Sequence, residues 1–422
     1  MSKKTAVRTL AATAAGTALL AAGLAGCSTD SAGSSSSDTL TVGVNGGASM
    51  NAVKATFEKA NPGVTIQVKD YSQNFREVIG TQLAGGNAPD VLAITGGGGN
   101  NISAKVAGDK GYYADLSGQS WAAMVPATPK EQLSNTKGQL VAVPMTLSSI
   151  GGIYNQGAIQ AAGLSVPNTW SQVLQFCQEA KAKGKVAYGL GLSDTWTTQM
   201  IPYALTASLV YGPDPKFTSE QSKGTKSFSQ SAWKTSLDMY MQMKGQGCFN
   251  SSPNGTPYSQ VQDAIRKGKT LATVSVASET AAIELTGPAD LDLTYAAFPA
   301  TDDASQTYLS TSTVGFGMNA KTQKKALAEK FLSWLATPET QVAYAKAFGD
   351  TAAMPGDVKQ ERQVSTLVQE YVDKDRITVW PDRDWPTTTI QPEVFDGVQA
   401  LFSGRAHVGD VLKKMDAAFT QS

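Results

Sequence analysis

The sequence of 422 residues contains a single histidine, His407, and only three cysteines. A single histidine excludes a metal site built from several imidazole ligands. It also argues against a catalytic triad that depends on histidine as the base. We therefore expect no metal and no cofactor in this protein.

The chain also lacks an excess of charge of either sign. Lys and Arg together number 35, as do Asp and Glu, and no basic stripe runs along the sequence. We therefore expect no nucleic-acid partner. Long hydrophobic runs are missing from the body of the chain too. The one extended apolar run, residues 10–26, contains only Leu, Ala, Gly and Thr and is shorter than the roughly 20 strongly apolar residues of a transmembrane helix.

The N-terminus carries a targeting signal. Three basic residues and no acidic residue precede the apolar run, which is typical of a secretory signal peptide. The end of the run, Leu24-Ala25-Gly26-Cys27, resembles a bacterial lipobox. That resemblance implies cleavage before Cys27, a diacylglycerol on its thiol and anchoring at the outer face of the cell membrane. An ordinary cleavage site with an incidental cysteine is the alternative.

The segment after the cysteine is a linker. Residues 28–38 are rich in Ser and Gly, a composition that gives a flexible chain. We therefore predict a signal peptide over 1–26 and a tether over 27–38. The remaining body holds two cysteines, Cys177 and Cys248. An even number in an exported protein predicts a disulfide, with two buried thiols as the alternative.

The body alternates strand and helix patterns. Residues 39–44 and 64–71 read as strands, and the segments that follow them have apolar residues at helical spacing. A third, mostly apolar strand starts at Asp90. This order predicts an α/β fold with a mainly parallel sheet. Further along, residues 140–146 and 151–156 read as two separate strands, and the chain ends in a pair of helices.

Five segments, in order, resemble the family 1 extracellular solute-binding proteins, the receptors of ABC importers. They are "FEKANPGVTIQV", "LAGGNAPDVLAI", "KGQLVAVPMTLSSIGGIYNQ", "IRKGKTLATVSVAS" and "KKALAEKFLSWLATPETQ". The resemblance covers residues 39–420. It implies a two-lobed, periplasmic-binding-protein-like fold of type II, with the ligand in a cleft between the lobes.

The same resemblance implies the division of the chain and its partners. Lobe 1 would comprise residues 39–148 and about 277–320, and lobe 2 residues 149–276 and about 321–422. A carbohydrate would bind, the lobes would close by hinge motion, and the ABC permease would receive the ligand. The protein would be a monomer without catalytic residues.

Ligands of open α/β sheets bind beyond the carboxyl ends of strands, so the candidate site residues come from loops at strand ends. In the first lobe these loops are 45–47 and 95–101, and their candidates are Asn45, Gly46, Gly97, Gly98 and Asn100. Backbone amides and glycines allow a ligand to approach closely. A plain turn with a helix cap, or a mobile loop, is the alternative at both places. Relatives place an aromatic or charged residue in the second loop, and this chain does not.

The second set of candidates joins tryptophans with carboxylates. An indole stacks on the apolar face of a sugar, and carboxylates bind its hydroxyl groups. The candidates are Asp194, Trp196, Ser278, Glu279, Trp380, Asp382, Asp384 and Trp385. A core position is the alternative for Trp196, a solvated helix start for Glu279 and a packing corner for residues 380–386.

Two other functions remain open at this point. An exported glycosidase would need two carboxylates on either side of a glycosidic bond, and Asp194, Glu279 and Asp384 are available. A lipoprotein adhesin or chaperone would bind through flat surfaces and would not be stabilised by a small molecule. A non-sugar solute is a further alternative within the receptor family.

Overall fold

The computed structural model describes residues 38–71 and 74–420. The predicted signal peptide, Cys27 and the predicted tether up to residue 37 lie outside the described residues. No helix within the described ranges is long and apolar enough to cross a membrane. The described residues belong to one compact unit.

The first part of the body, residues 38–95, follows the predicted alternation. The elements are β1 (Asp38–Val44), α1 (Ala48–Ala60), β2 (Val64–Asp70), α2 (Phe75–Gly85) and β3 (Val91–Thr95). Strand β1 pairs in parallel with both β2 and β3. The pattern was readable from sequence because Val53 and Phe57 of α1, and Ile79 and Leu83 of α2, are buried at helical spacing.

The rest of the chain adds seven strands and most of the helices. The strands are β4 (Val143–Asn155), β5 (Val186–Tyr188), β6 (Thr270–Val276), β7 (Leu293–Ala296), β8 (Leu309–Met318), β9 (Thr351–Ala352) and β10 (Ile377–Val379). The helices up to β8 are α3 (Ala104–Asp109), α4 (Ala127–Gln132), α5 (Gln156–Ala161), α6 (Trp170–Ala182), α7 (Met200–Thr206), α8 (Phe217–Ser222), α9 (Trp233–Gln246), α10 (Tyr258–Arg266) and α11 (Glu279–Leu285). Those after β8 are α12 (Lys325–Leu335), α13 (Pro338–Phe348), α14 (Gln363–Asp373), α15 (Pro381–Asp384), α16 (Ile390–Phe402) and α17 (Val408–Thr420).

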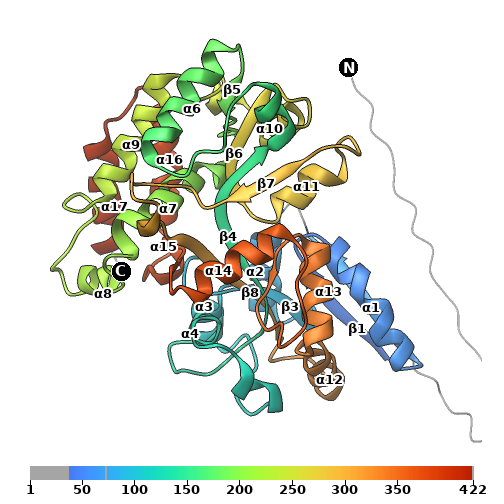
Figure 1. Cartoon of the computed structure of the whole chain (residues 1–422). Coiled ribbons are helices and arrows are strands. Elements are labelled where there is room, and N and C mark those ends of the chain that lie inside the picture. The colour runs from blue at the N-terminus through green and yellow to red at the C-terminus, as the bar shows by residue number, and fades with distance from the viewer. Residues whose placement is uncertain (1–37, 72–73, 421–422) are drawn as a thin grey trace, which may run out of the picture. The chain divides into compact units, whose positions relative to one another are not determined.

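One sheet runs through these elements in the order β2-β1-β3-β8-β4-β6-β5. Strand β8 joins β3 antiparallel, and β4 joins both β8 and β6 antiparallel. The sheet is therefore mixed, and the prediction of a mainly parallel sheet holds for β1–β3 but not for the centre. Strands β4 and β8 lie side by side in the middle of the chain's fold (Figure 1).

Strand β4 is continuous, although the sequence predicted two strands there. All 13 of its residues are buried. Its two glycines, Gly151 and Gly152, suggested a break between two strands, but they allow β7 to lie close to β4. A Cβ atom on Gly151 would stand 2.5 Å from the carbonyl oxygen of Ala296, which pairs with Gly152. Glycine inside a strand often marks such a contact.

The buried side chains form two large clusters and a smaller third one, which includes Tyr258, Val261 and Ile265 of α10. The first cluster is made by residues from Leu40 to Met145 and from Phe316 to Met354. The second cluster is made by residues from Ile150 to Ala300 and from Trp380 to Phe419. Strand β4 contributes to both, with Met145 in the first cluster and Tyr154 in the second.

Helices α12 and α13 belong with the first cluster, although the sequence assigned residues 321–422 to the second lobe. Phe331 of α12 packs edge to face on Phe57 of α1, with ring centroids 5.0 Å apart. Helix α13 lies beside α1 (Figure 1). The helical patterns were readable from sequence, but the neighbour of each helix depends on contacts with residues almost 300 positions earlier.

Cys177 and Cys248 form a disulfide with their Cα atoms 4.7 Å apart, which confirms the predicted pairing. The bond joins α6 to the second residue after α9, and both cysteines lie in the second cluster. Closing a loop of this length stabilises a fold by about 4 kcal/mol in the chain-entropy model.

Candidate functional site

The loop after β1 is occupied by a side chain of the protein itself. The carboxylate of Asp70 accepts hydrogen bonds from the backbone amides of Gly46 and Gly47, at 3.1 and 2.8 Å. Asn45 is exposed beside them. The amides that the sequence offered to a ligand therefore hold the end of β2 against the start of α1.

The loop after β3 is folded tightly on its own residues. The Asn100 side chain donates to the Thr95 hydroxyl at 2.8 Å and accepts from the Ile102 amide at 3.1 Å. The Ser103 hydroxyl donates to the Asn100 carbonyl oxygen. Asn100 is only 5% exposed, so its amide group shapes the loop that starts α3.

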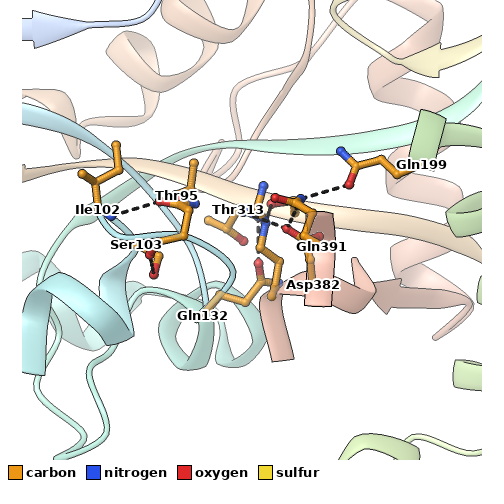
Figure 2. Close-up of polar contacts among 11 residues, drawn as sticks. Thr95, Ile102, Ser103, Gln132, Gln199, Thr313, Asp382 and Gln391 are labelled. Atoms are coloured by element: carbon orange, nitrogen blue, oxygen red, sulfur yellow. Dashed lines mark hydrogen bonds and ion pairs between the residues drawn. The ribbon is translucent and has the colours of Figure 1, made fainter. Parts of the chain in front are cut away.

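A buried polar network lies beside this loop (Figure 2). The Gln391 amide nitrogen donates to the Asp382 carboxylate and to the Gln199 side chain, both at 3.0 Å. The Asp382 carboxylate also forms an ion pair with Arg383 at 3.3 Å, and Arg383 donates to the Ser312 hydroxyl of β8. This network connects α16, the 3₁₀ turn at 195–199, α15 and a crossing strand.

Helix α4 reaches the same place from the first cluster. The Gln132 side-chain oxygen accepts a hydrogen bond from the Thr313 amide of β8 at 2.8 Å (Figure 2). The Arg76 guanidinium of α2 also interacts with this network. Burial lowers the pKa of Arg76, and the like charge of Arg383 lowers it further, whereas Asp382 opposes the change.

Some buried polar atoms in this network have no hydrogen-bond partner among the described residues: Gln132 Nε2, Thr313 Oγ1 and Asp382 Oδ1. Unpaired buried polar groups are costly, and ordered water or a ligand usually satisfies them. The network therefore has unused hydrogen-bonding capacity at the junction of the two clusters.

The two late tryptophans lie in the core. Trp385 is 2% exposed, and its ring contacts Tyr203, Phe228 and Trp233. Trp380 is 8% exposed, with the Arg383 guanidinium over its ring and its indole nitrogen donating to the Ser310 carbonyl oxygen. Neither ring has a face free for stacking, so the packing-corner interpretation describes both residues.

A second group of candidates does come together, on one face of α10. The Trp196 indole is partly exposed and lies edge to face on Tyr258, with ring centroids 4.9 Å apart. The Asp194 carboxylate accepts a hydrogen bond from the Tyr258 amide at 2.6 Å. Asp194 thus caps the N-terminus of α10, where a negative charge is favourable.

Glu279 reaches the same helix from the end of β6. Its carboxylate accepts a hydrogen bond from Gln262, one helical turn after Tyr258, at 2.7 Å. Burial raises the pKa of Glu279, and the hydrogen bond from Gln262 opposes the rise. Ser278 precedes α11 without forming a side-chain cap. Helix α10 is therefore contacted by all three of Asp194, Trp196 and Glu279.

Asp384 is exposed at the end of α15. Its charge interacts with Lys105 of α3, with Glu131 of α4 and with Asp382. It therefore faces charged groups of the first cluster rather than the group on α10.

Sequence reasoning missed Tyr258, Gln262, Gln199, Gln391 and Gln132. Tyr258 and Gln262 stand four residues apart on a helix, and Gln391 lies inside another helix, so none of them follows a strand. The spacing of Tyr258 and Gln262 was the one available signal, since residues i and i+4 share a helix face.

The chemistry available at α10 is hydrogen bonding and aromatic contact. Two carboxylates and a partly exposed indole that contact the same helix suit a ligand with hydroxyl groups and an apolar face. Within the part of the chain that the structure describes, no cluster of His, Cys, Asp and Glu side chains is arranged to hold a metal ion.

Comparison with known proteins agrees with this architecture. The family model described as bacterial extracellular solute-binding protein matches residues 42–342. A curated relative, the multiple sugar-binding protein of Streptococcus mutans, is 21% identical over 345 residues, which are 80% of each chain.

Solved structures share the fold. RafE in complex with raffinose superposes with a TM-score of 0.75 at 21% identity, covering 91% of this chain and 99% of that one. A sugar transporter protein from Bacillus licheniformis in complex with stachyose gives a TM-score of 0.71 at 19% identity, with the same coverage of 91% and 99%. The predicted two-lobed fold class is confirmed, and the chain belongs to the bacterial extracellular solute-binding protein family.

Proposed function

We propose that the protein is the substrate-binding receptor of an ABC importer and that it binds a carbohydrate between its two hydrophobic clusters. The supporting observation is the group on α10, where the partly exposed Trp196 indole contacts Tyr258, the Asp194 carboxylate binds the Tyr258 amide and the Glu279 carboxylate binds Gln262. Membership of the family and the sugars named for its relatives support the same ligand class.

We propose the clusters as the two lobes of the receptor. The first lobe would then contain residues 40–145 and 316–354, and the second residues 150–300 and 380–419. The crossing strands β4 and β8 would form the connection about which the lobes move. Closure would bring the α10 group and the loops of the first lobe onto opposite sides of the ligand.

Binding requires no chemical step in this proposal. Both carboxylates of the α10 group are engaged by the protein, Asp194 as a helix cap and Glu279 with Gln262. The permease would take up the ligand from the closed receptor. The lipid on Cys27 would hold the receptor beside the permease at the outer face of the membrane, because two acyl chains give stable anchoring.

The test of ligand class is a thermal-shift screen followed by calorimetry, on the full chain with Cys27→Ser. The panel contains raffinose, stachyose, galactose, chitin oligosaccharides and non-sugar solutes such as polyols. A ligand that binds only the folded state raises the melting temperature. We expect at least one sugar to do so, without release of new reducing ends on prolonged incubation.

Two outcomes would contradict the proposal. Stabilisation by a non-sugar solute alone would reject the carbohydrate, and turnover of a bound sugar would identify an enzyme. The anchor is tested separately by feeding cells an alkyne-tagged fatty acid. The wild-type protein should carry the tag in the membrane fraction, and Cys27→Ser should lose both tag and membrane association.

A further inference from the structure

The four consecutive glycines at 96–99 contact another part of the backbone. The Gly98 amide donates to the Arg383 carbonyl oxygen at 2.7 Å. A Cβ atom on Gly99 would stand 2.5 Å from the Asp382 carbonyl oxygen, and one on Gly97 would overlap the Arg383 carbonyl. Glycine is therefore required here because two backbone segments touch.

The glycine loop is attached to the first cluster. The Gly96 amide donates to the Thr313 carbonyl oxygen at 2.9 Å, and the Gly97 carbonyl accepts from the Lys105 amide at 3.0 Å. The loop leads directly into Ile102 and Ala104, which are both fully buried members of that cluster. Displacing the loop would therefore displace part of the first cluster.

The partner segment, residues 382–385, is attached to the second cluster. The Trp385 ring is enclosed by three aromatic side chains of that cluster, with centroid distances of 5.7–6.2 Å. Asp382 is held by Gln391 of α16 at 3.0 Å. The segment therefore cannot leave the second cluster without breaking an aromatic core and a buried hydrogen bond.

We propose that the contact between glycines 96–99 and residues 382–385 positions the two clusters relative to each other and thereby sets the affinity for the ligand. This proposal rests on the proposed function in one respect, because it takes the two clusters to be the lobes that enclose a ligand. The glycines act as positioning residues. A side chain in this loop would hold the clusters further apart and would lower the population of the state that binds.

Gly99 and Gly97 differ as test positions. Gly97 has a φ of +73°, so any side chain there adds backbone strain to the steric effect. Gly99 is not among the glycines with positive φ, so Gly99→Ala adds no backbone strain of this kind, only a methyl group 2.5 Å from the carbonyl oxygen and 2.7 Å from a carboxylate oxygen of Asp382. Gly118→Ala is the matched control, because a Cβ there meets nothing within 4 Å.

The test measures the distance between the clusters without any ligand. Dyes are attached to Lys59→Cys on α1 and Lys413→Cys on α17, two exposed positions, in the full chain with Cys27→Ser. Cys177 and Cys248 are bonded to each other and are not labelled. We expect single-molecule energy transfer in Gly99→Ala to shift to longer distances than in the wild type. Gly118→Ala should give the wild-type distribution.

A Gly99→Ala protein that melts normally and has the wild-type distance distribution would overturn the proposal. Should Gly99→Ala fail to fold, Gly98→Ala replaces it, since its Cβ would stand 3.0 Å from the Trp385 carbonyl oxygen. A smaller shift in the same direction is then expected, and no shift would again overturn the proposal. Because the distance is measured without ligand, a failed sugar screen leaves this result interpretable.

Discussion

The Trp196 indole stands edge to face against the Tyr258 ring, with centroids 4.9 Å apart and planes at 69°. This contact fixes the orientation of an indole that remains partly exposed. Edge-to-face pairs are a favourable aromatic geometry, worth about 0.5–1.5 kcal/mol beyond the area they bury. Tyr258 therefore holds Trp196 in place while leaving part of its surface for a ligand.

Replacing Trp196 should weaken sugar binding more than it weakens folding. Trp196→Ala removes the surface on which a sugar would lie, and we expect a loss of affinity of tenfold or more, about 1.4 kcal/mol. Trp170→Ala is the control, since Trp170 is another half-buried tryptophan packed on the second cluster. Calorimetry with the sugar identified by screening should find near-normal affinity for Trp170→Ala. Equal affinity in both variants would remove Trp196 from the site.

Replacing Trp385 should weaken folding more than it weakens sugar binding. Its side chain is 2% exposed in an aromatic core, so Trp385→Ala leaves a large cavity. Substitutions of this kind cost about 3–5 kcal/mol of unfolding free energy. Urea unfolding monitored by circular dichroism measures the loss. A variant as stable as the wild type would show that the core tolerates the cavity and would reopen a ligand role for this residue.

The two tryptophans also show what the sequence can and cannot provide. Both stand beside aspartates near strand ends, and the local pattern is the same for each. Only long-range packing separates them, because Trp385 meets Tyr203 and Phe228 from segments more than 150 residues away. Helices and strands depend on local periodicity and were predictable, whereas the exposure of one ring depends on the whole fold.

The glycine loop and helix α10 illustrate the same limit in the site. Four glycines in a row indicate close approach, but the sequence does not say whether a ligand or a backbone approaches. Conversely, Tyr258 and Gln262 carry no signal of their own, because they become part of the candidate site only through Asp194 and Glu279. The expectation that site residues follow strands located Asp194, Trp196 and Glu279. Helix α10, which these residues contact, comes from a different part of the chain.

Removing the disulfide should destabilise the second cluster. The double variant Cys177→Ser/Cys248→Ser loses the cross-link and places two hydroxyl groups at fully buried positions. Loss of a native disulfide typically costs about 2–5 kcal/mol. Urea unfolding in the Cys27→Ser background measures this loss. Alkylation in denaturant without reductant is the check on the wild-type bond, and labelling of both cysteines there would contradict it.

The contribution of Asp350 to the stability of the protein should fall as the pH rises from about 4 to about 7. This carboxyl group is 1% exposed, and burial raises its pKa to about 7, against the effects of the Thr351 amide, the Ser148 hydroxyl and Arg362. The unfolded chain releases the proton near the ordinary value of 3.8. Between these values the folded chain binds a proton that the unfolded chain does not, so raising the pH favours unfolding.

Asp350→Asn should remove this contribution, since the amide is neutral at every pH and similar in shape. Each pH unit within the window contributes at most about 1.4 kcal/mol to the difference between wild type and variant. The measurement is urea unfolding at several pH values from about 4.5 to about 7, within the window set by the two pKa values. Asp357→Asn, at an exposed aspartate of the same segment, is the control and should keep the wild-type slope. Parallel pH profiles for wild type and Asp350→Asn would show that Asp350 is ionised in the folded protein throughout this range.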